Sequence, residues 1–336
     1  MKIITDPNQV DKKKWSEFVY SHPNGNIFQT PEMYDVYKKT KNYEPIFVSI
    51  IDNNRVEALL LAAIQKENYG IFSFLTARSI IFGGPLIGSK ETFLLDLLLN
   101  EYSKLIKYKA IYTQIRNFWD FKREECIFNK YGFKLDDHLN IINDLSISIE
   151  KQWINLSKGR RKGIKKAKSY GFIFEEVNMK LALPQFFKLL SNLYLRIKLP
   201  IPTISYFENL IVALEEKGQI IFFNLRNEDE VLISFLGLLY KKTIYGYYIG
   251  HLDDSNIKSN KAMDLFFWEL LQWGSINGFD RFDWMGAGKP DKDYGVRDFK
   301  LQYGGELFNF GRFEKAHNPL LYNIGTIGLF IWQKLK

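Results

Sequence analysis

Cysteine and histidine are scarce in this chain of 336 residues. The lone cysteine, Cys126, excludes an intrachain disulfide and a zinc site built on several thiolates. The four histidines are scattered, and no two of them have the spacing of metal ligands: His22, His138, His251 and His317. The chain also lacks a Gly-x-Ser-x-Gly nucleophile elbow and a Gly-x4-Gly-Lys-Ser/Thr phosphate loop. We therefore expect no metal centre. We also expect a reaction that uses neither a serine nucleophile on such an elbow nor a phosphate loop of that type.

Long hydrophobic runs are absent as well. The N-terminal residues contain no apolar run of signal-peptide length, and no stretch reaches the length that spans a membrane. The most apolar stretch, residues 320–332, is too short and too rich in glycine to span. We expect residues 316–336 to form a C-terminal amphipathic helix that packs on the protein or rests on a membrane surface. The expected location is the cytoplasm, with the inner face of the membrane as the alternative.

Positive charge, by contrast, is concentrated in one segment. Residues 151–170 hold eight of the 46 basic side chains and no acidic one, so outside this segment the chain has 38 residues of each sign. The whole formal charge of +8 therefore belongs to these twenty residues. Charge gathered in this way indicates a polyanionic partner such as phosphate, pyrophosphate or nucleic acid, although a solvated basic helix between two domains would look the same.

Within the basic segment, Leu156, Ile164 and Ala167 form a thin apolar stripe that favours a packed helix over a mobile tail. Gly159 and Gly163 are poor helix residues and could instead let the backbone approach a ligand. Guanidinium groups can grip phosphate with two hydrogen bonds, and lysines add point charge. The predicted phosphate- or tRNA-binding residues are Arg160, Arg161, Lys162, Lys165 and Lys166.

The rest of the sequence predicts a folded α/β (α+β) protein with an internal repeat of element order. Hydrophobic residues make up 46% and aromatics 16%, enough for two cores of ordinary size. Each half reads as two helices, a strand meander, a long apolar helix and a further strand. In the first half these are a first helix indicated by Trp15, Phe18 and Val19, then residues 31–39, 46–51, 56–64, 69–75, 80–82, 92–105 and 110–115, followed by a helix over 121–130 and a strand region over 133–145. In the second half they are residues 183–195, 204–216, 219–225, 231–239, 243–249, 262–273 and 279–284.

Three short motifs resemble the Fem family, the non-ribosomal peptidyltransferases that add amino acids to cell-wall precursors. The segment Phe28-Gln-Thr-Pro-Glu-Met33 resembles the family's F-x-Q-[ST]-x-x-W opening, with Met33 or Tyr34 where Trp is usual. Ile164-Lys-Lys-Ala-Lys-Ser-Tyr-Gly171 resembles its R-x-x-I-[KR]-[KR]-A-x-x-x-G segment. Phe299-Lys-Leu-Gln-Tyr-Gly-Gly-Glu306 resembles its C-terminal F-K-x-x-F-G-G motif, with Tyr303 in place of the second Phe.

This resemblance implies an acyltransferase built from two tandem GNAT-like domains with mixed central sheets, and no coiled-coil arm. The expected parts are a first domain over 1–148, a basic connecting segment over 149–172, a second domain over 173–315 and the C-terminal helix. The implied donor is aminoacyl-tRNA, with no bound cofactor. The implied acceptor is a nucleotide- or lipid-linked precursor of the cell envelope, such as a peptidoglycan peptide or a related glycan amine.

Three residues are the candidates for catalysis. The resemblance implies that Lys300 supports the transferred carbonyl or the phosphate end of the donor; a surface lysine beside a core Phe is the alternative. Tyr248 lies in the strand where acetyltransferase-type folds splay open, and its hydroxyl could donate to the carbonyl or hold the acceptor, or simply pack in the core. Asp283 ends the last strand of the second half, where it could orient the acceptor amine, accept its proton or cap the next turn.

Substrate contacts are expected in both halves. In the first half the candidates, which could face an acceptor carrying pyrophosphate, are Gln29, Tyr34, Lys38 and Lys39. In the second half the candidates are Arg297, as an anchor for acceptor phosphate, and the motif residues Phe299 and Tyr303.

The donor remains open between two chemistries. Enzymes that use coenzyme A hold its pyrophosphate in a glycine-rich turn at the start of the long helix. Here that place reads Asn256-Ile-Lys-Ser-Asn-Lys-Ala262 and lacks paired glycines, and residues 88–92 of the first half lack the pattern too. An acyl-CoA-dependent N-acyltransferase acting on an amino sugar of a surface polysaccharide is therefore the alternative to the aminoacyl-tRNA enzyme. An inactive module that binds RNA or phosphorylated glycans is the third possibility.

Overall fold

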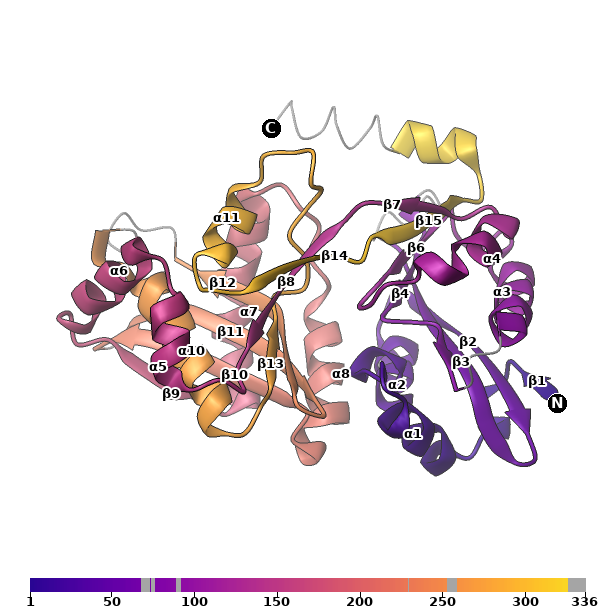
Figure 1. Cartoon of the computed structure of the whole chain (residues 1–336), viewed down its shortest axis with the longest axis horizontal. Coiled ribbons are helices and arrows are strands. Elements are labelled where there is room, and N and C mark those ends of the chain that lie inside the picture. Colours follow the sequence, from indigo (N-terminus) through magenta and orange to yellow (C-terminus); the bar gives the residue numbers. More distant parts are fainter. Residues whose placement is uncertain (68–72, 74–75, 89–91, 229, 253–258, 326–336) are drawn as a thin grey trace. The chain divides into compact units, whose positions relative to one another are not determined.

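The computed structural model describes residues 1–67, 73, 76–88, 92–228, 230–252 and 259–325 (Figure 1). The chain forms two compact units, one made of residues 1–137 with the chain from 310 onward, the other of residues 138–309. The strand expected over 69–75 lies almost entirely outside the described residues, and so do residues 89–91 and 256–258 of the two places compared with a coenzyme A turn.

The first unit is built on an eight-stranded sheet in which β1, β2, β3, β4, β6, β15 and β7 follow one another and β5 pairs with β3. Its strands are β1 (Lys2–Ile4), β2 (Tyr43–Asp52), β3 (Arg55–Gln65), β4 (Arg78–Phe82), β5 (Leu86–Ile87), β6 (Tyr112–Arg116), β7 (Lys134–Asp136) and β15 (Arg312–Ala316). Its helices are α1 (Lys12–Ser21), α2 (Pro31–Lys39), α3 (Thr92–Ile106) and α4 (Glu125–Lys130), with 3₁₀ turns at Pro7–Gln9, Ile27–Gln29 and Lys122–Glu124.

Alternation along the strands of the first unit sends neighbouring side chains to opposite faces of the sheet. Val48 and Ile50 of β2 pack in one core with the leucines of α3, whose buried positions recur at helical spacing. Phe47 of β2 points the other way, where its ring lies 4.4 Å from that of Trp15 on α1. Helices therefore cover both faces of the β2–β3 end of this sheet.

The second unit is built on a seven-stranded sheet in the order β14, β8, β13, β12, β11, β10, β9. Its strands are β8 (Leu139–Asp144), β9 (Ile173–Glu176), β10 (Ile220–Asn227), β11 (Glu230–Tyr240), β12 (Thr243–His251), β13 (Arg281–Asp283) and β14 (Glu306–Asn309). Its helices are α5 (Ile149–Asn155), α6 (Lys158–Lys168), α7 (Met179–Arg196), α8 (Ile204–Leu214), α10 (Ala262–Ile276) and α11 (Gly295–Leu301), with a 3₁₀ turn at Glu215–Lys217.

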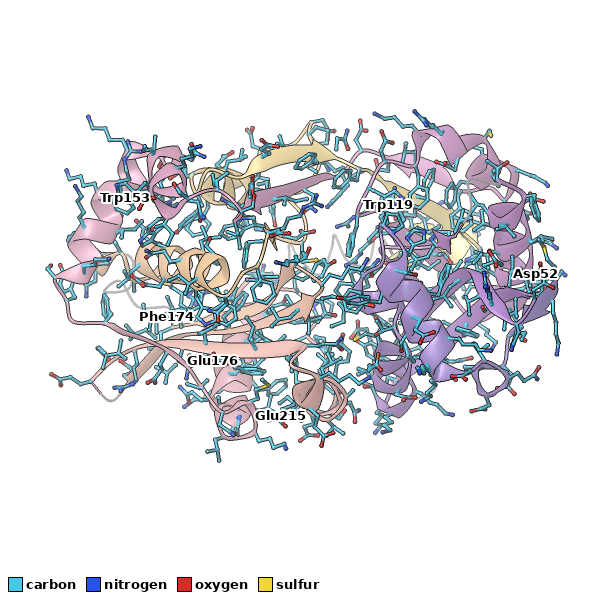
Figure 2. All side chains as sticks on the ribbon, turned by 60° about the horizontal axis from the view of Figure 1, so that its bottom comes forward. Asp52, Trp119, Trp153, Phe174, Glu176 and Glu215 are labelled. Atoms are coloured by element: carbon cyan, nitrogen blue, oxygen red, sulfur yellow. The ribbon has the colours of Figure 1, made fainter. Side chains whose placement is uncertain are left out.

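Helices cover both faces of the second sheet as well. Phe222 and Phe223 are neighbours on β10, yet the first ring meets Phe186 of α7 and the second meets Trp273 of α10. Figure 2 labels Trp153 on α5 and Phe174 on β9. On α10, the ring centre of Trp268 lies 5.0 Å from that of Trp153, and the ring centre of Phe266 lies 5.5 Å from that of Phe174. Aromatic contacts of this kind stabilise a core that contains no disulfide.

Each unit contains the predicted order of helix pair, antiparallel meander, long helix and parallel strand, so both sheets are mixed as expected. β4 pairs in parallel with β6, and β12 in parallel with β13, while the remaining pairs are antiparallel. Two strands lie in the other sheet from the strand that precedes them in the chain: β8, which follows β7, joins the second sheet between β13 and β14, and β15, which follows β14, joins the first sheet between β6 and β7.

This arrangement moves the expected domain boundaries. The strand region predicted over 133–145 is two strands in two different sheets, β7 and β8, so the first unit ends at 137 rather than 148. The predicted connecting segment 149–172 lies inside the second unit, where α6 packs on α10. Residues 312–315, expected in the second domain, belong to β15 of the first sheet.

At the C-terminal end, residues 319–325 are helical, and the remainder of the expected helix, 326–336, lies outside the described residues. Within the part of the chain that is described, no helix is both long enough and apolar enough to cross a membrane.

The basic segment folds as the helix α6 straight through both of its glycines. Ser157 caps it by accepting a hydrogen bond from the backbone N–H of Arg160 at 3.2 Å. Gly163 has a packing role, because a Cβ there would lie 1.9 Å from Asp264 Oδ2 on α10. A Cβ at Gly159 would meet nothing closer than Ser157 Oγ, at 3.9 Å. Gly163 therefore allows the close contact between α6 and α10. Gly159 has no neighbour that requires a glycine.

This contrast gives a matched pair of substitutions. We expect Gly163→Ala to lower the free energy of unfolding by about 1–3 kcal/mol, because the methyl group overpacks the crossing of α6 with α10. We expect Gly159→Ala to raise it by about 0.4–1 kcal/mol, since alanine has room there and restricts the unfolded chain. Chemical denaturation of both variants checks this, and equal effects of the same sign would contradict the packing role of Gly163.

Candidate functional site

The second sheet opens between β12 and β13. These parallel strands pair only from Thr243–Tyr245 against Arg281–Asp283, while β12 remains paired with β11 as far as His251. Trp284, the residue after β13, turns to β8 and donates its backbone N–H to Ile141 at 3.1 Å. In open α/β sheets, ligands bind at such a point beyond the carboxyl ends of parallel strands.

The edge of β12 beyond this point carries a bulge. Leu236 is opposite Tyr248 but Gly237 is opposite Gly246, so Tyr247 is the extra residue. The ring of Tyr248 packs against those of Phe207 at 5.1 Å and Tyr194 at 6.2 Å, on the side covered by α7 and α8. The predicted catalytic Tyr248 therefore lies on the separated part of β12, within an aromatic cluster.

The loop after β13 has an unusual backbone that brings two carbonyl groups together. Met285, Gly286 and Gly288 have φ of 57°, 108° and 75°. Lys300 of α11 reaches into this loop and donates hydrogen bonds from Nζ to the carbonyl oxygens of Trp284 at 2.8 Å and Gly286 at 2.6 Å. The predicted lysine is thus a largely buried cation held at the opening of the sheet, and not a surface side chain.

Burial lowers the pKa of Lys300 to about 8, while the nearby Asp283 carboxylate acts in the opposite direction. Two of the three N–H donors of the ammonium are used by the loop carbonyls. Among the residues that the structure describes, none accepts a third hydrogen bond from this ammonium, which leaves one N–H for an oxygen of a ligand. A cation in this setting can stabilise a negative charge that develops on a neighbouring carbonyl.

Asp283 is 4% exposed at the end of β13, and its carboxylate has partners inside the unit. One oxygen accepts the backbone N–H of Met285 at 2.8 Å, and the other accepts Asn140 Nδ2 at 3.2 Å. Burial raises the pKa of Asp283, and these hydrogen bonds, together with Lys300, oppose that rise. Of the roles predicted for Asp283, the cap of the following turn is the one these contacts form.

Two asparagines of β8 organise the loop, and sequence reasoning missed both. Asn140 Oδ1 accepts the backbone N–H of Gly286 at 2.9 Å while its Nδ2 donates to Asp283. Asn143 Oδ1 accepts Trp284 Nε1 at 2.6 Å, and its Nδ2 donates to the Tyr303 carbonyl at 2.8 Å. Both side chains are 6% exposed. The available signal was two amides inside an otherwise apolar strand.

Phe299 and Tyr303, predicted to contact substrate, lie with Arg160 in a buried cluster. The Arg160 guanidinium lies 4.2 Å from the Phe299 ring centre and 5.1 Å from that of Tyr303. Arg160 forms an ion pair with Asp264 of α10, with side-chain exposures of 13% and 7%. Tyr303 is 1% exposed and donates its hydroxyl to the Met263 carbonyl at 3.2 Å. This cluster fixes α11 to α6 and α10.

The basic residues of α6 divide into two groups. Arg160 and Arg161 are used internally, the second donating to the carbonyls of Ile154 and Leu156 at 2.7 Å and 2.6 Å at the end of α5. Both arginines therefore have structural contacts, and the phosphate grip expected of them stays a prediction. The lysines are exposed on the opposite side of the helix: Lys158, Lys162, Lys165, Lys166 and Lys168.

Arg297 also has a structural role. Its guanidinium donates to the carbonyls of Lys289 at 2.6 Å and Lys292 at 2.7 Å, which braces the loop that precedes α11. These contacts use two of the five N–H donors of the guanidinium, and its expected role as an anchor for acceptor phosphate stays a prediction.

The four substrate contacts predicted in the first half lie in the first unit and differ in burial and in their contacts. Gln29 is fully buried, where its Nε2 donates to Leu61 and Phe82 carbonyls and its Oε1 accepts the Leu61 N–H. Tyr34 packs its ring on Trp15 and Phe47. Lys38 and Lys39 are exposed at the end of α2. The motif glutamine therefore tethers the loop before α2 to the sheet, and the two lysines stay accessible.

Two further features concern metal ligands and cavities. Among the described residues, no group of three or more His, Cys, Asp or Glu side chains is placed to hold a metal ion. The second unit has a cavity of about 350 Å³ on the side of α5, with Lys151, Asn155, Tyr303 and Glu306 in its wall. Lys300 and Tyr248 do not line this cavity.

Comparison with known proteins agrees with this geometry. Residues 155–300 match the model of a family described as acetyltransferase (GNAT) domain. No curated protein sequence matches the chain.

Several solved structures share the fold. FemX has a TM-score of 0.73 at 16% identity, covering 96% of this chain and 99% of that one. L-PGS from Bacillus licheniformis has a TM-score of 0.58 at 15% identity, covering 97% and 96%. A tandem GNAT protein from the clavulanic acid biosynthesis pathway has a TM-score of 0.59 at 8% identity, covering 95% and 99%.

These likenesses extend over nearly the whole of each chain and concern the fold. The predicted tandem GNAT architecture is confirmed, and the likeness to FemX confirms the predicted resemblance at the level of the fold. The predicted acyltransferase is confirmed at the level of the domain: the matched residues contain the opening of the sheet, the loop after β13 and Lys300.

Proposed function

We propose, on the premise that this chain is a Fem-like acyltransferase of the GNAT superfamily, that it forms an amide by transferring an activated acyl or aminoacyl group to an amine. The observation that carries the proposal is the buried ammonium of Lys300 at the opening between β12 and β13. A fixed positive donor at this place stabilises the transition state of amide formation, because negative charge develops on the carbonyl oxygen during transfer.

In the proposed reaction, the amine nitrogen of the acceptor attacks the activated carbonyl, and the C–N bond forms as the oxygen becomes negative. The remaining N–H of Lys300 donates to that oxygen. Collapse of the intermediate breaks the bond to the leaving group. The amine loses one proton and the leaving group takes up one proton. Asp283 acts through Lys300, because its carboxylate field favours the charged ammonium.

For the donor we propose aminoacyl-tRNA, and for the acceptor a nucleotide- or lipid-linked precursor of the cell envelope, with the reaction taking place in the cytoplasm. The exposed lysines of α6 support a polyanionic donor, since five of them lie on this one helix of the second unit and no acidic residue lies between them in the sequence. Lysines suit this role because point charges contact phosphates without requiring one geometry.

An acyl-CoA donor is the second candidate, since the matched family model is that of an acetyltransferase domain. The experiment that separates the two incubates the whole chain with a nucleotide-linked wall-peptide precursor and either labelled aminoacyl-tRNA or labelled acyl-CoA. The proposal expects label from the tRNA in an amide product. Transfer from acyl-CoA alone would replace the donor, and RNA binding without transfer from either would contradict an enzyme.

The α6 lysines give a separate prediction about donor binding. Replacing Lys162, Lys165 and Lys166 by serine removes three phosphate contacts. We expect the slope of log binding constant against log salt concentration for charged tRNA to become less negative by about 2–3, because each contact contributes about 0.7–0.9. Fluorescence anisotropy at several salt concentrations measures this slope.

The matched control changes three exposed lysines of the first unit, Lys13, Lys104 and Lys107, to serine. The net charge falls by the same amount, so a general electrostatic effect would weaken both variants alike. An unchanged slope in the α6 variant would remove α6 from the donor site.

A further inference from the structure

The turn from α6 to β9 places two aromatic rings beside the basic helix. Tyr170 comes just after α6, and Phe172 directly precedes β9. The backbone N–H of Tyr170 donates to the Ala167 carbonyl at 3.1 Å, and Gly171 follows with φ of 69°, the left-handed conformation in which helices commonly end. The rings of Tyr170 and Phe172 are stacked, with centres 5.8 Å apart and planes at 28°. The helix end thus holds Tyr170 in a defined turn.

The two stacked rings differ in burial. Phe172 packs against the core cluster of the second unit, which includes Ile164 and Ala167 of α6. Tyr170 stacks on Phe172 and is 44% exposed. Among the described residues, the Tyr170 ring contacts no other aromatic ring. The core therefore supports one ring, this ring supports the next, and the exposed surface of Tyr170 can continue the stack with a planar ligand.

The exposed lysines of α6 form a row that leads along the helix toward this ring. Lys158, Lys162 and Lys165 are four and three residues apart, so they lie on one side of the helix, and Lys166 follows. At about 1.5 Å per residue, the row extends over about 12 Å of the helix axis. Among the described residues these four ammonium groups form no ion pair, whereas Lys168 pairs with an acid of α10.

Acidic side chains are absent from the sequence around the ring. Residues 151–174 contain no Asp or Glu, and the first acid after Tyr170, Glu175, pairs with Arg226 at 2.9 Å. An exposed aromatic ring at the end of a row of unpaired lysines is the combination that binds single-stranded nucleic acid, because lysines contact the phosphates and the ring stacks with a base. A base inside a duplex is already stacked and paired, so the ligand chemistry is that of an unpaired strand.

We propose that Tyr170 stacks with an unpaired base of a single-stranded RNA segment whose phosphates lie along the lysines of α6. Tyr170 belongs to the donor site only if the donor is RNA, so this inference rests on the proposed function. It adds that the donor is held through a single-stranded part, by a base contact as well as by charge. Stacking tolerates any base, since every base has an aromatic face.

The test compares two labelled probes that have the same length and charge, an oligoadenylate and an abasic oligoribonucleotide, by fluorescence anisotropy with the whole chain. We expect the wild type to bind the oligoadenylate more tightly. In Tyr170→Ser the affinity for the oligoadenylate should fall by about fivefold to a hundredfold, the loss of one stacked base. Its affinity for the abasic probe and its dependence on salt should be unchanged, because no phosphate contact is lost.

Two variants control for the ring and for its surroundings. Tyr170→Phe keeps the ring and should bind both probes as the wild type does. Tyr108→Ser removes a tyrosine of the first unit that is 90% exposed and has the Lys107 ammonium 5.0 Å from its ring centre, and it should also bind both probes normally. A loss in Tyr108→Ser equal to that in Tyr170→Ser would contradict a specific site at the end of α6.

The outcomes also separate this inference from the donor proposal. Undiminished binding of the oligoadenylate by Tyr170→Ser, in a protein that takes label from charged tRNA, would overturn the role of Tyr170 and leave the donor. Equal affinity of the wild type for both probes, or an equal loss for both in Tyr170→Ser, would overturn it as well. A wild type that binds neither probe and takes label from acyl-CoA alone would contradict the donor and the stacking site together.

Discussion

The variant Lys300→Met is expected to lose acyl transfer by a factor of about 10²–10³, because removing one donor to a developing oxyanion has that effect. Methionine keeps much of the length and apolar stem of lysine but cannot donate to the carbonyls of Trp284 and Gly286. The loss should appear in kcat more than in KM, since the contact to oxygen strengthens only as the reaction proceeds. Initial rates of amide formation with the donor identified by labelling measure both constants.

Its control is Lys292→Met, in the exposed loop before α11. This variant changes the charge equally and should retain the wild-type rate. A defect caused by misfolding would also lower the stability of Lys300→Met, so its unfolding transition is measured beside its activity. Full activity in a folded Lys300→Met variant would remove the lysine from catalysis.

The second large effect concerns the buried ion pair between Arg160 and Asp264. Burial raises the pKa of Asp264 even though Arg160 favours its charged form, so desolvation outweighs the attraction. We expect Arg160→Met or Asp264→Leu alone to lower the free energy of unfolding by about 3–5 kcal/mol, because each leaves one buried charge without its partner. The double variant should recover most of this loss, which a double-mutant cycle in urea measures.

An exposed pair between the same two helices is the control. Lys168 Nζ lies 3.6 Å from Glu269 Oε1, and the side chains are 56% and 30% exposed. Lys168→Met should change stability by less than about 1 kcal/mol, as surface ion pairs do. If Arg160→Met had a similarly small effect, the cluster that joins α6, α10 and α11 would not depend on the ion pair.

The sequence was sufficient for the order of elements and for singling out Lys300 as a candidate, and insufficient for what surrounds the lysine. Hydrophobic periodicity and three motifs located the helices, the meanders and the C-terminal lysine. The partners of Lys300 are backbone carbonyls in a loop with positive φ, and side-chain identity carries little information about them. Asn140, which holds that loop, precedes Asp283 by 143 positions.

Arg160 and Gln29 show why motif residues were assigned to ligands. Arginine in a basic segment resembles a phosphate grip, but its partner Asp264 lies 104 positions away, so only the packing of α6 on α10 reveals it. Gln29 bonds to three backbone groups that come together only in the folded sheet. The placement of β8 and β15 was hidden for a similar reason, since a strand pattern does not say which sheet the strand joins.

The most direct test of Lys300 as the catalytic cation is the pH dependence of the single-turnover rate of amide formation. Lys300 must be charged to stabilise the oxyanion, and its pKa is about 8, so the rate should fall as pH rises through about 8. In Lys300→Met the residual rate should show no such descending limb. A wild-type rate that does not decline up to about pH 10, or a decline that persists in Lys300→Met, would contradict the role given to this lysine.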